Sequence, residues 1–172
     1  PGRGAGPAPY NPAMIFRPDV TVAAVVERDG RFLLVEERAG RRIVFNQPAG
    51  HLEDGETLLE AAVRETLEET ACRFTPQSLL GVYLWRNPAN DRTFLRVAFT
   101  GTVGDPEPGR ALDRSIIRTT WLSRSQLADR PNTLRSPLVL QCIADYERGT
   151  RHPLSVLQTL DLDLRPAVSG TR

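Results

Sequence analysis

The chain has 172 residues, enough for one domain and little more, and it is 40% apolar and 25% charged, as expected of a globular protein. Its formal net charge is +1, so no overall basic field favours binding to nucleic acid. All 22 basic residues are arginine, which excludes a P-loop lysine, a Schiff-base lysine and a lysine general base. Any bound phosphate must therefore be met by arginine, backbone amides or a metal.

The ends of the chain differ in composition from its middle. Residues 1–13 are rich in proline and glycine and are expected to form a flexible extension, followed by one domain over residues 14–160 and a tail over residues 161–172. The two cysteines, Cys72 and Cys142, match no metal or redox spacing, and no apolar stretch is long enough to cross a bilayer. We therefore expect a cytoplasmic protein with no membrane partner and no nucleic-acid partner.

The first third of the domain carries strand patterns. Asp19–Val26 and Arg31–Glu37 are β-branched and apolar, and the turn signal Asp29-Gly30 between them predicts a hairpin of these two strands. Ile43–Phe45 is predicted as a short strand, and residues 57–70 as a helix.

The remainder alternates strands and short helices. Leu79–Trp85 and Phe94–Val103 are predicted strands joined by a polar loop, and a Gly/Pro-rich loop over residues 104–114 is long enough to be functional. The other predicted elements are a strand at Ile116–Leu122, a short helix at Ser123–Ala128, and a helix to Arg148 with Ser136 as N-cap and Pro137 in its first turn. Strands mixed with two or three helices predict an α+β, or mixed α/β, fold.

Acidic residues are concentrated on the first predicted helix. Seven of the chain's 21 acids lie between Glu53 and Glu69, against the single base Arg64. Glu65, Glu68 and Glu69 fall within an arc of about 100°, roughly opposite a group expected to pack on the core: Leu59, Val63, Leu67 and Thr70. Clustered like charges cost about 0.2–0.5 kcal/mol per pair, which bound Mg²⁺ would offset. The alternative is a solvated acidic face.

The spacing of these charges matches a known signature. The pattern Gly50-x5-Glu56-x7-Arg64-Glu65-x2-Glu68-Glu69 resembles the Nudix box, the loop–helix–loop signature of the Nudix hydrolases, and matches it at every charged position. Two positions depart from it. Thr66 replaces an aliphatic residue, and Ala71 replaces a glycine just past the helix, where a left-handed cap would strain alanine by roughly 1 kcal/mol.

The resemblance runs from about Met14 to Leu160. The segments Asn46–Glu53 and Leu134–Leu138 look like the NudJ-type phosphatases of that superfamily. The resemblance implies a Nudix fold, an α/β/α sandwich with a mixed central sheet. It also implies a Mg²⁺-dependent hydrolase, with Mn²⁺ as the alternative metal, in which a metal-assisted water attacks phosphorus. Such enzymes release phosphate or pyrophosphate from nucleoside tri- and diphosphates or thiamine-pathway pyrophosphates.

The resemblance also assigns roles to residues. The implied metal ligands are the Ala49 backbone carbonyl and the carboxylates of Glu65, Glu68 and Glu69. Glu56 and Arg64 would form an ion pair that holds the box loop, which begins at Gly50. The general base stays open between Glu65 or Glu68 inside the box and Asp113 in the later loop.

Substrate contacts are expected outside the box. In a chain without lysine, Arg96 and Arg135 are the candidate phosphate ligands, the second beside a helix N-terminus. Trp85, Phe45 and Phe94 are candidates for stacking on a base or pyrimidine ring.

Other activities fit the same box. A narrower Nudix pyrophosphatase for ADP-ribose or a mutagenic nucleotide is one alternative, and a non-catalytic nucleotide-sensing module is another. Since specificity resides in loops outside the box, the signature does not separate the enzymes. The intact set of carboxylates favours catalysis over sensing.

Overall fold

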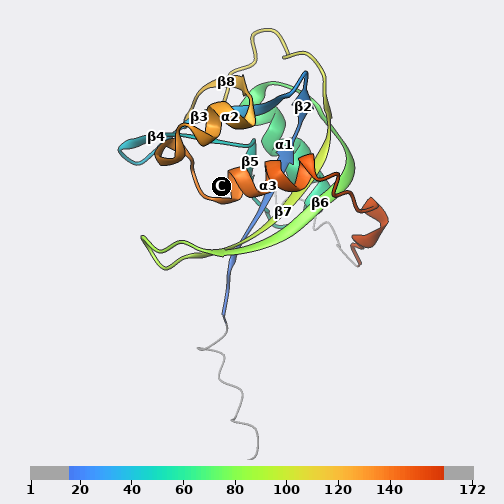
Figure 1. Cartoon of the computed structure of the whole chain (residues 1–172). Helices are drawn as coiled ribbons and strands as arrows, with labels where there is room; N and C mark the ends of the chain where they lie inside the picture. The colour runs from blue at the N-terminus through green and yellow to red at the C-terminus, as the bar shows by residue number, and fades with distance from the viewer. Residues whose placement is uncertain (1–15, 161–172) are drawn as a thin grey trace, which may run out of the picture.

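The computed structural model describes residues 16–160; the extension expected over residues 1–13 and the tail expected over residues 161–172 lie outside this range. The strands form two four-stranded sheets (Figure 1). The first sheet has the order β5-β1-β7-β6, built from β1 (Asp19–Val25), β5 (Ala49–His51), β6 (Phe74–Arg86) and β7 (Thr93–Val103). In the second, β3 (Arg31–Ala39) pairs with β2 (Glu27–Arg28), β4 (Arg42–Asn46) and β8 (Ile116–Leu122).

Both parallel and antiparallel pairs occur, so the mixed sheet predicted from the sequence is confirmed. β1 runs parallel to β7, and the other strand pairs are antiparallel. The strands are, however, divided between two sheets rather than joined in one central sheet, because β3 does not pair with β1 and pairs instead with β2, β4 and β8.

Helices cover both faces of the first sheet (Figure 1). Along β1, successive side chains point to opposite sides. Val22 and Ala24 belong to one core cluster with residues of α1 (Leu58–Thr70), and Ala23 and Val25 belong to a second with residues of α3 (Leu138–Glu147). Two-sided burial makes β1 the centre of an α/β/α arrangement, as predicted. The short α2 (Arg124–Ala128) packs with α3.

The predicted hairpin between Asp19–Val26 and Arg31–Glu37 is wrong. β1 pairs with β5 and β7, whereas β3 takes the two-residue β2 as its hairpin partner. The turn at Asp29 and Gly30 does form, with positive φ at both residues as such turns require. The chain leaves the first sheet at Val26, so the turn joins only the two residues of β2 to β3.

The predicted N-cap of the last helix is also wrong. Pro137 occupies the N-cap position of α3, and the Ser136 hydroxyl is buried with no hydrogen-bond partner instead of capping the helix. The helix ends at Glu147, and Gly149 follows with φ +78°, a backbone conformation that favours glycine.

Thr57 and Ala71 bound α1. The Thr57 hydroxyl accepts from the Glu60 N–H and the Glu60 carboxylate accepts from the Thr57 N–H, a reciprocal capping box. At the other end Ala71 has φ 59°, the left-handed conformation that glycine adopts without strain.

We expect Ala71→Gly to stabilise the folded chain by about 1 kcal/mol, because it removes the Cβ clash of the left-handed cap. Denaturant unfolding measures this change. The matched control is Ala144→Gly, which lies in the interior of α3 and should lower stability by a similar amount. Equal destabilisation by both changes would contradict the strained cap.

Candidate functional site

Helical periodicity predicts that the carboxylates of α1 lie opposite its packed face. The structure shows a different arrangement. Glu69 is only 6% exposed and belongs to the buried face together with Ala62 and Thr66, whereas Glu68 is exposed. Small residues let this face approach the strands closely, and β5 passes over the side that carries Glu65 and Glu69. Two of the three carboxylates are thereby enclosed between the helix and the sheet.

Arg64 ties the box loop to the helix. Its guanidinium donates two hydrogen bonds to Glu56, at 2.6 and 2.9 Å, and further bonds to Glu65 at 2.8 Å and Glu68 at 3.2 Å. It also donates to the His51 carbonyl oxygen at 3.0 Å. The ion pair expected between Glu56 and Arg64 is therefore present, and it fixes the Glu65 carboxylate as well. Hydrogen bonds to Arg64 lower the pKa of Glu56.

Gly50 leaves the space that the Glu65 carboxylate fills. A Cβ built at Gly50 would lie 2.0 Å from the Glu65 carboxyl carbon, far inside van der Waals contact. Next to it, the Ala49 N–H donates to the Glu69 carboxylate at 2.9 Å. β5 and the box helix thus hold the two enclosed carboxylates in place by one close approach and one hydrogen bond.

Two backbone hydrogen bonds attach the Gly/Pro-rich loop, residues 104–114, to the end of α1. The Glu107 N–H donates to the Ala71 carbonyl at 2.8 Å, and the Asp113 N–H donates to the Glu68 carbonyl at 2.9 Å. These bonds satisfy carbonyls that a helix C-terminus otherwise leaves without partners. They also carry Asp113 to the side of the helix where Glu69 is enclosed.

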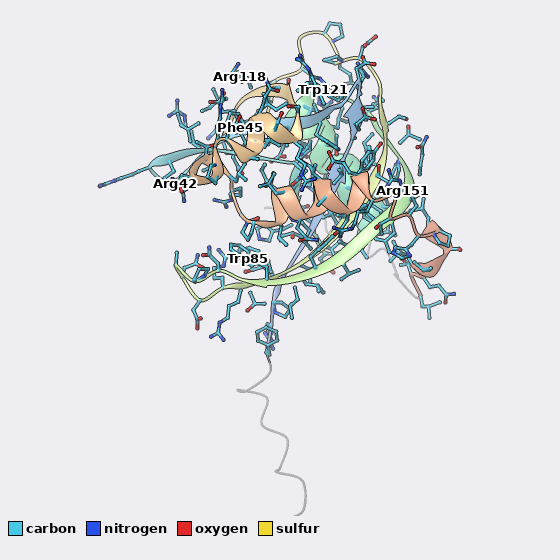
Figure 2. The ribbon with its side chains drawn as sticks, in the orientation of Figure 1. Arg42, Phe45, Trp85, Arg118, Trp121 and Arg151 are labelled. Atoms are coloured by element: carbon cyan, nitrogen blue, oxygen red, sulfur yellow. The ribbon has the colours of Figure 1, made fainter. Side chains whose placement is uncertain are left out.

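These elements surround a cavity of about 410 Å³. Most of the site residues predicted from the sequence line it: Ala49, Gly50, Glu65, Glu69, Trp85, Arg96, Asp113 and Arg135. Glu68 does not line it and faces solvent beside Arg64, so its role as a ligand stays a prediction. Phe45 is only 7% exposed and belongs to the core cluster packed on α3, so its expected place in the substrate site is not supported. Figure 2 shows Phe45 on β4 and Trp85 on the β6–β7 hairpin, at separate places in the fold.

Several residues of the cavity were missed from the sequence: Thr21, Glu37, Asn46, Asn87, Asn90, Arg92, Ser136 and Leu138. For one of them, Glu37, the sequence does contain a signal. On β3, Leu33, Val35 and Glu37 share a strand face, and the first two are fully buried. Glutamate is rarely buried in a strand unless it has a partner or a function, and here Glu37 lines the cavity.

The acidic end of the cavity favours bound cations. The pKa of Glu69 is raised from an ordinary value of 4.5 to about 9, chiefly by burial and in smaller part by the nearby carboxylates of Glu37, Glu65 and Asp113. Burial raises the pKa of Glu65 too, although Arg64 opposes this. The crowding of acids is costly unless a positive ion offsets it.

The donor set at this end suits a hard divalent metal. All side-chain donors there are carboxylate oxygens, which Mg²⁺ and Mn²⁺ prefer. Within residues 16–160 no three His, Cys, Asp or Glu side chains yet converge on one point. Glu65 is drawn toward Arg64 and Glu69 toward the Ala49 N–H, so both side chains would have to rotate away from these partners to share one ion.

Arg96 supplies positive charge inside the same cavity. It is only 7% exposed, its Nε has no hydrogen-bond partner, and its Nη1 lies 3.5 Å from the side-chain oxygens of Asn46 and Gln47. In the described part of the chain no carboxylate lies within ion-pair distance of it, and burial lowers its pKa. A buried guanidinium without a counter-ion is a site for an anion.

An aromatic wall closes the other side of the cavity. Trp85 and Phe94 face each other across the β6–β7 pair and stack, with ring centroids 5.8 Å apart and planes inclined by 23°. Arg92 lies over the Phe94 ring at 5.3 Å and is held by two hydrogen bonds to Asp19. The wall stands near the loop end of the β6–β7 hairpin, which extends as a long arm (Figure 1).

Comparison with known proteins shows which family this chain resembles. The NUDIX domain family model matches residues 16–141. Phosphatase NudJ of Escherichia coli K12 is 42% identical over 144 residues, which cover 83% of this chain and 92% of the relative. A NUDIX hydrolase from Nitrosomonas europaea is 48% identical, with a TM-score of 0.82, over 84% of this chain and 99% of that chain.

A more distant neighbour shows the fold alone. It is a bifunctional NMN adenylyltransferase/ADP ribose pyrophosphatase from Francisella tularensis, complexed with AMP and a Mn ion, which is 22% identical with a TM-score of 0.61 over 79% of this chain and 43% of that chain. Separately, among residues 16–160 no helix has the length and apolar character needed to span a membrane.

Proposed function

Because the chain belongs to the Nudix hydrolases and is a hydrolase of phosphorus-containing anhydrides, we propose that it is a divalent-metal-dependent phosphatase with Mg²⁺ as the metal. Its proposed substrates are nucleoside tri- and diphosphates or thiamine-pathway pyrophosphates. The observation that carries the proposal is the charge layout of one cavity. The enclosed carboxylates of Glu65 and Glu69 lie at one end together with Asp113, which is exposed, and the buried guanidinium of Arg96, which forms no ion pair within residues 16–160, lies in the same space.

The box residues would hold the metal. Glu65 and Glu69 line the cavity, the Ala49 carbonyl belongs to the same strand edge, and Glu68 lies one helical turn from Glu65. When bound, the metal neutralises phosphate oxygens and activates a water for attack on phosphorus. The bifunctional Francisella neighbour was solved with a Mn ion, which is in keeping with a divalent cation as the proposed cofactor.

The arginines would bind and orient the phosphates. Arg96 offers an unused Nε–H from the cavity wall, and Arg135 is half-exposed at the rim with its Nε 3.6 Å from Glu37. Two guanidiniums at different depths suit a chain of two or three phosphates better than a single one. The absence of lysine is thereby accounted for at this site.

Asp113 is our proposed general base. It lines the cavity, and its backbone N–H is anchored to the end of the metal-binding helix. A base must be within reach of the attacking water, and an anchored loop holds it there. Glu65 is the alternative, but its carboxylate is ion-paired with Arg64, whereas among the described residues the Asp113 carboxylate accepts only from the adjacent Arg114 N–H.

We expect Asp113→Asn to lower kcat by about a hundredfold or more with little change in KM, because the proton acceptor is lost while the phosphate ligands stay. Steady-state kinetics measure both constants. The matched control is Asp105→Asn, an exposed carboxylate of the same loop that does not line the cavity. An unchanged kcat in Asp113→Asn would move the base into the box.

The substrate class is tested by a Mg²⁺-dependent screen of nucleoside tri- and diphosphates, thiamine pyrophosphate and ADP-ribose, with the products identified. Release of inorganic phosphate supports the phosphatase. Release of pyrophosphate or a mononucleotide would favour the narrower pyrophosphatase instead. Tight binding without turnover of any compound would favour a sensing module.

The cellular setting is a proposal too. Cys72 and Cys142 are both free and buried, as suits the reducing cytoplasm expected from the sequence.

A further inference from the structure

Buried polar side-chain atoms without a partner gather in one place. Across residues 16–160 there are four: Thr21 Oγ1, Glu37 Oε1, Arg96 Nε and Ser136 Oγ. All four residues line the cavity of the proposed active site. Because buried polar atoms without partners are rare in folded proteins, their concentration here indicates that a ligand supplies the missing partners.

The four atoms differ in the kind of hydrogen-bond partner that each requires. Arg96 Nε only donates, the two hydroxyls donate or accept, and the Glu37 carboxylate beside Arg135 offers an acceptor. A phosphate group suits Arg96 but not Glu37, since two anions repel. A metal ion suits Glu37 poorly too, because the Arg135 guanidinium lies 3.6 Å from its unpartnered oxygen. Since Arg135 already supplies a positive charge to this oxygen, the hydrogen-bond donor that it lacks is best met by a neutral group with an N–H.

The aromatic wall indicates the shape of that group. Trp85 and Phe94 line the same cavity and are partly exposed, so the stacked pair offers an aromatic surface against which a planar heterocycle can pack. A planar ring that presents an N–H beside ring acceptors matches an amino-bearing heterocycle, with the Thr21 and Ser136 hydroxyls as donors to the ring atoms.

We propose that Glu37 is a specificity-determining residue that accepts a hydrogen bond from the exocyclic amino group of a substrate heterocycle such as cytosine or adenine. The inference rests on the proposed function and sharpens it: among phosphorylated substrates, those with an amino-bearing ring are preferred. A carbonyl in place of the amino group would set one acceptor against another and leave the buried carboxylate without a partner.

The test compares substrates that differ by this one group. Steady-state kcat/KM is measured for CTP against UTP and for ATP against ITP, with wild type and Glu37→Gln. We expect wild type to prefer the amino-bearing member of each pair by about tenfold or more, and Glu37→Gln to bring each ratio close to one. Glu36→Gln is the matched control, because Glu36 is the neighbouring residue, pairs with Arg118 and does not line the cavity. Its ratios should equal those of wild type.

A role for Glu37 in holding Arg135 alone would lower kcat/KM for both members of each pair and leave the ratios as they were, which would overturn the proposal. So would a wild type without preference. Calorimetric binding of CMP and UMP needs no turnover. It therefore distinguishes a failure of this inference from a failure of the proposed function. Preferential binding of CMP that Glu37→Gln abolishes supports the inference even if no substrate is hydrolysed. Equal binding of both overturns it even if hydrolysis is confirmed.

Discussion

Replacing Glu69 with glutamine is expected to reduce Mg²⁺-dependent hydrolysis by about a thousandfold, the upper end of what loss of one electrostatic contact in an active site costs. Glutamine has the same shape and still accepts from the Ala49 N–H, so the 2.9 Å hydrogen bond to β5 persists. What is lost is the charge that would bind the metal. Glu60→Gln is the matched control on the same helix, since it keeps the capping box and lies outside the cavity.

The same replacement should have the opposite effect on stability when a chelator removes metal. The folded state raises the pKa of Glu69 from 4.5 to about 9, so folding with this carboxylate charged is disfavoured. Below pH 4.5 both states hold the proton, and the variant and wild type should melt alike. As pH rises from 4.5 to 9, wild type loses stability that Glu69→Gln keeps. A variant that melts below wild type at pH 8 in chelator would contradict a buried, uncompensated charge.

Gly50→Ala is expected to reduce Mg²⁺ affinity by about ten- to a hundredfold, because the new Cβ would lie 2.0 Å from the Glu65 carboxyl carbon and displace that group. The melting temperature should change little. The atoms in the way belong to the end of a flexible side chain, and Gly50 does not have the positive φ that would strain an alanine. Metal titration followed by activity, together with thermal melting, measures both effects.

Gly104→Ala is the control for this change. Its built Cβ meets nothing within 4 Å, and its backbone does not require glycine either, so both readouts should match wild type. If Gly50→Ala binds Mg²⁺ as tightly as wild type, the placement of Glu65 is not what positions the metal.

Local elements of this fold could be predicted because their signals are local. The sequence predicts the box helix over residues 57–70, and the structure places it at Leu58–Thr70. The positions of β6 and β7 follow from their strand pattern and the polar loop between them. Strand pairing could not be predicted in the same way. The turn at Asp29 and Gly30 is the same whether its first strand has seven residues or two, so nothing near it reveals that β1 belongs to another sheet.

The same distinction between local sequence signals and tertiary contacts applies to the site. The charged residues of the box were found by spacing, since loop and helix are continuous in sequence. The burial of Glu69 was not foreseen, because it depends on β5 lying across the helix. Asp113 was proposed from its loop, but its anchor to the Glu68 carbonyl is a tertiary contact. Phe45 was misplaced because an aromatic residue at a strand end serves a core as readily as a pocket.

The central claim is that enclosed carboxylates of the box bind a divalent metal on which hydrolysis depends. It is tested most directly by release of inorganic phosphate from a nucleoside triphosphate at pH 8, followed while Mg²⁺ is added to metal-free wild-type protein, with the melting temperature measured at each step. We predict that activity is absent in chelator, that it rises with Mg²⁺, and that the melting temperature rises over the same concentration range. Full activity in chelator, or a melting temperature that Mg²⁺ does not change, would contradict it.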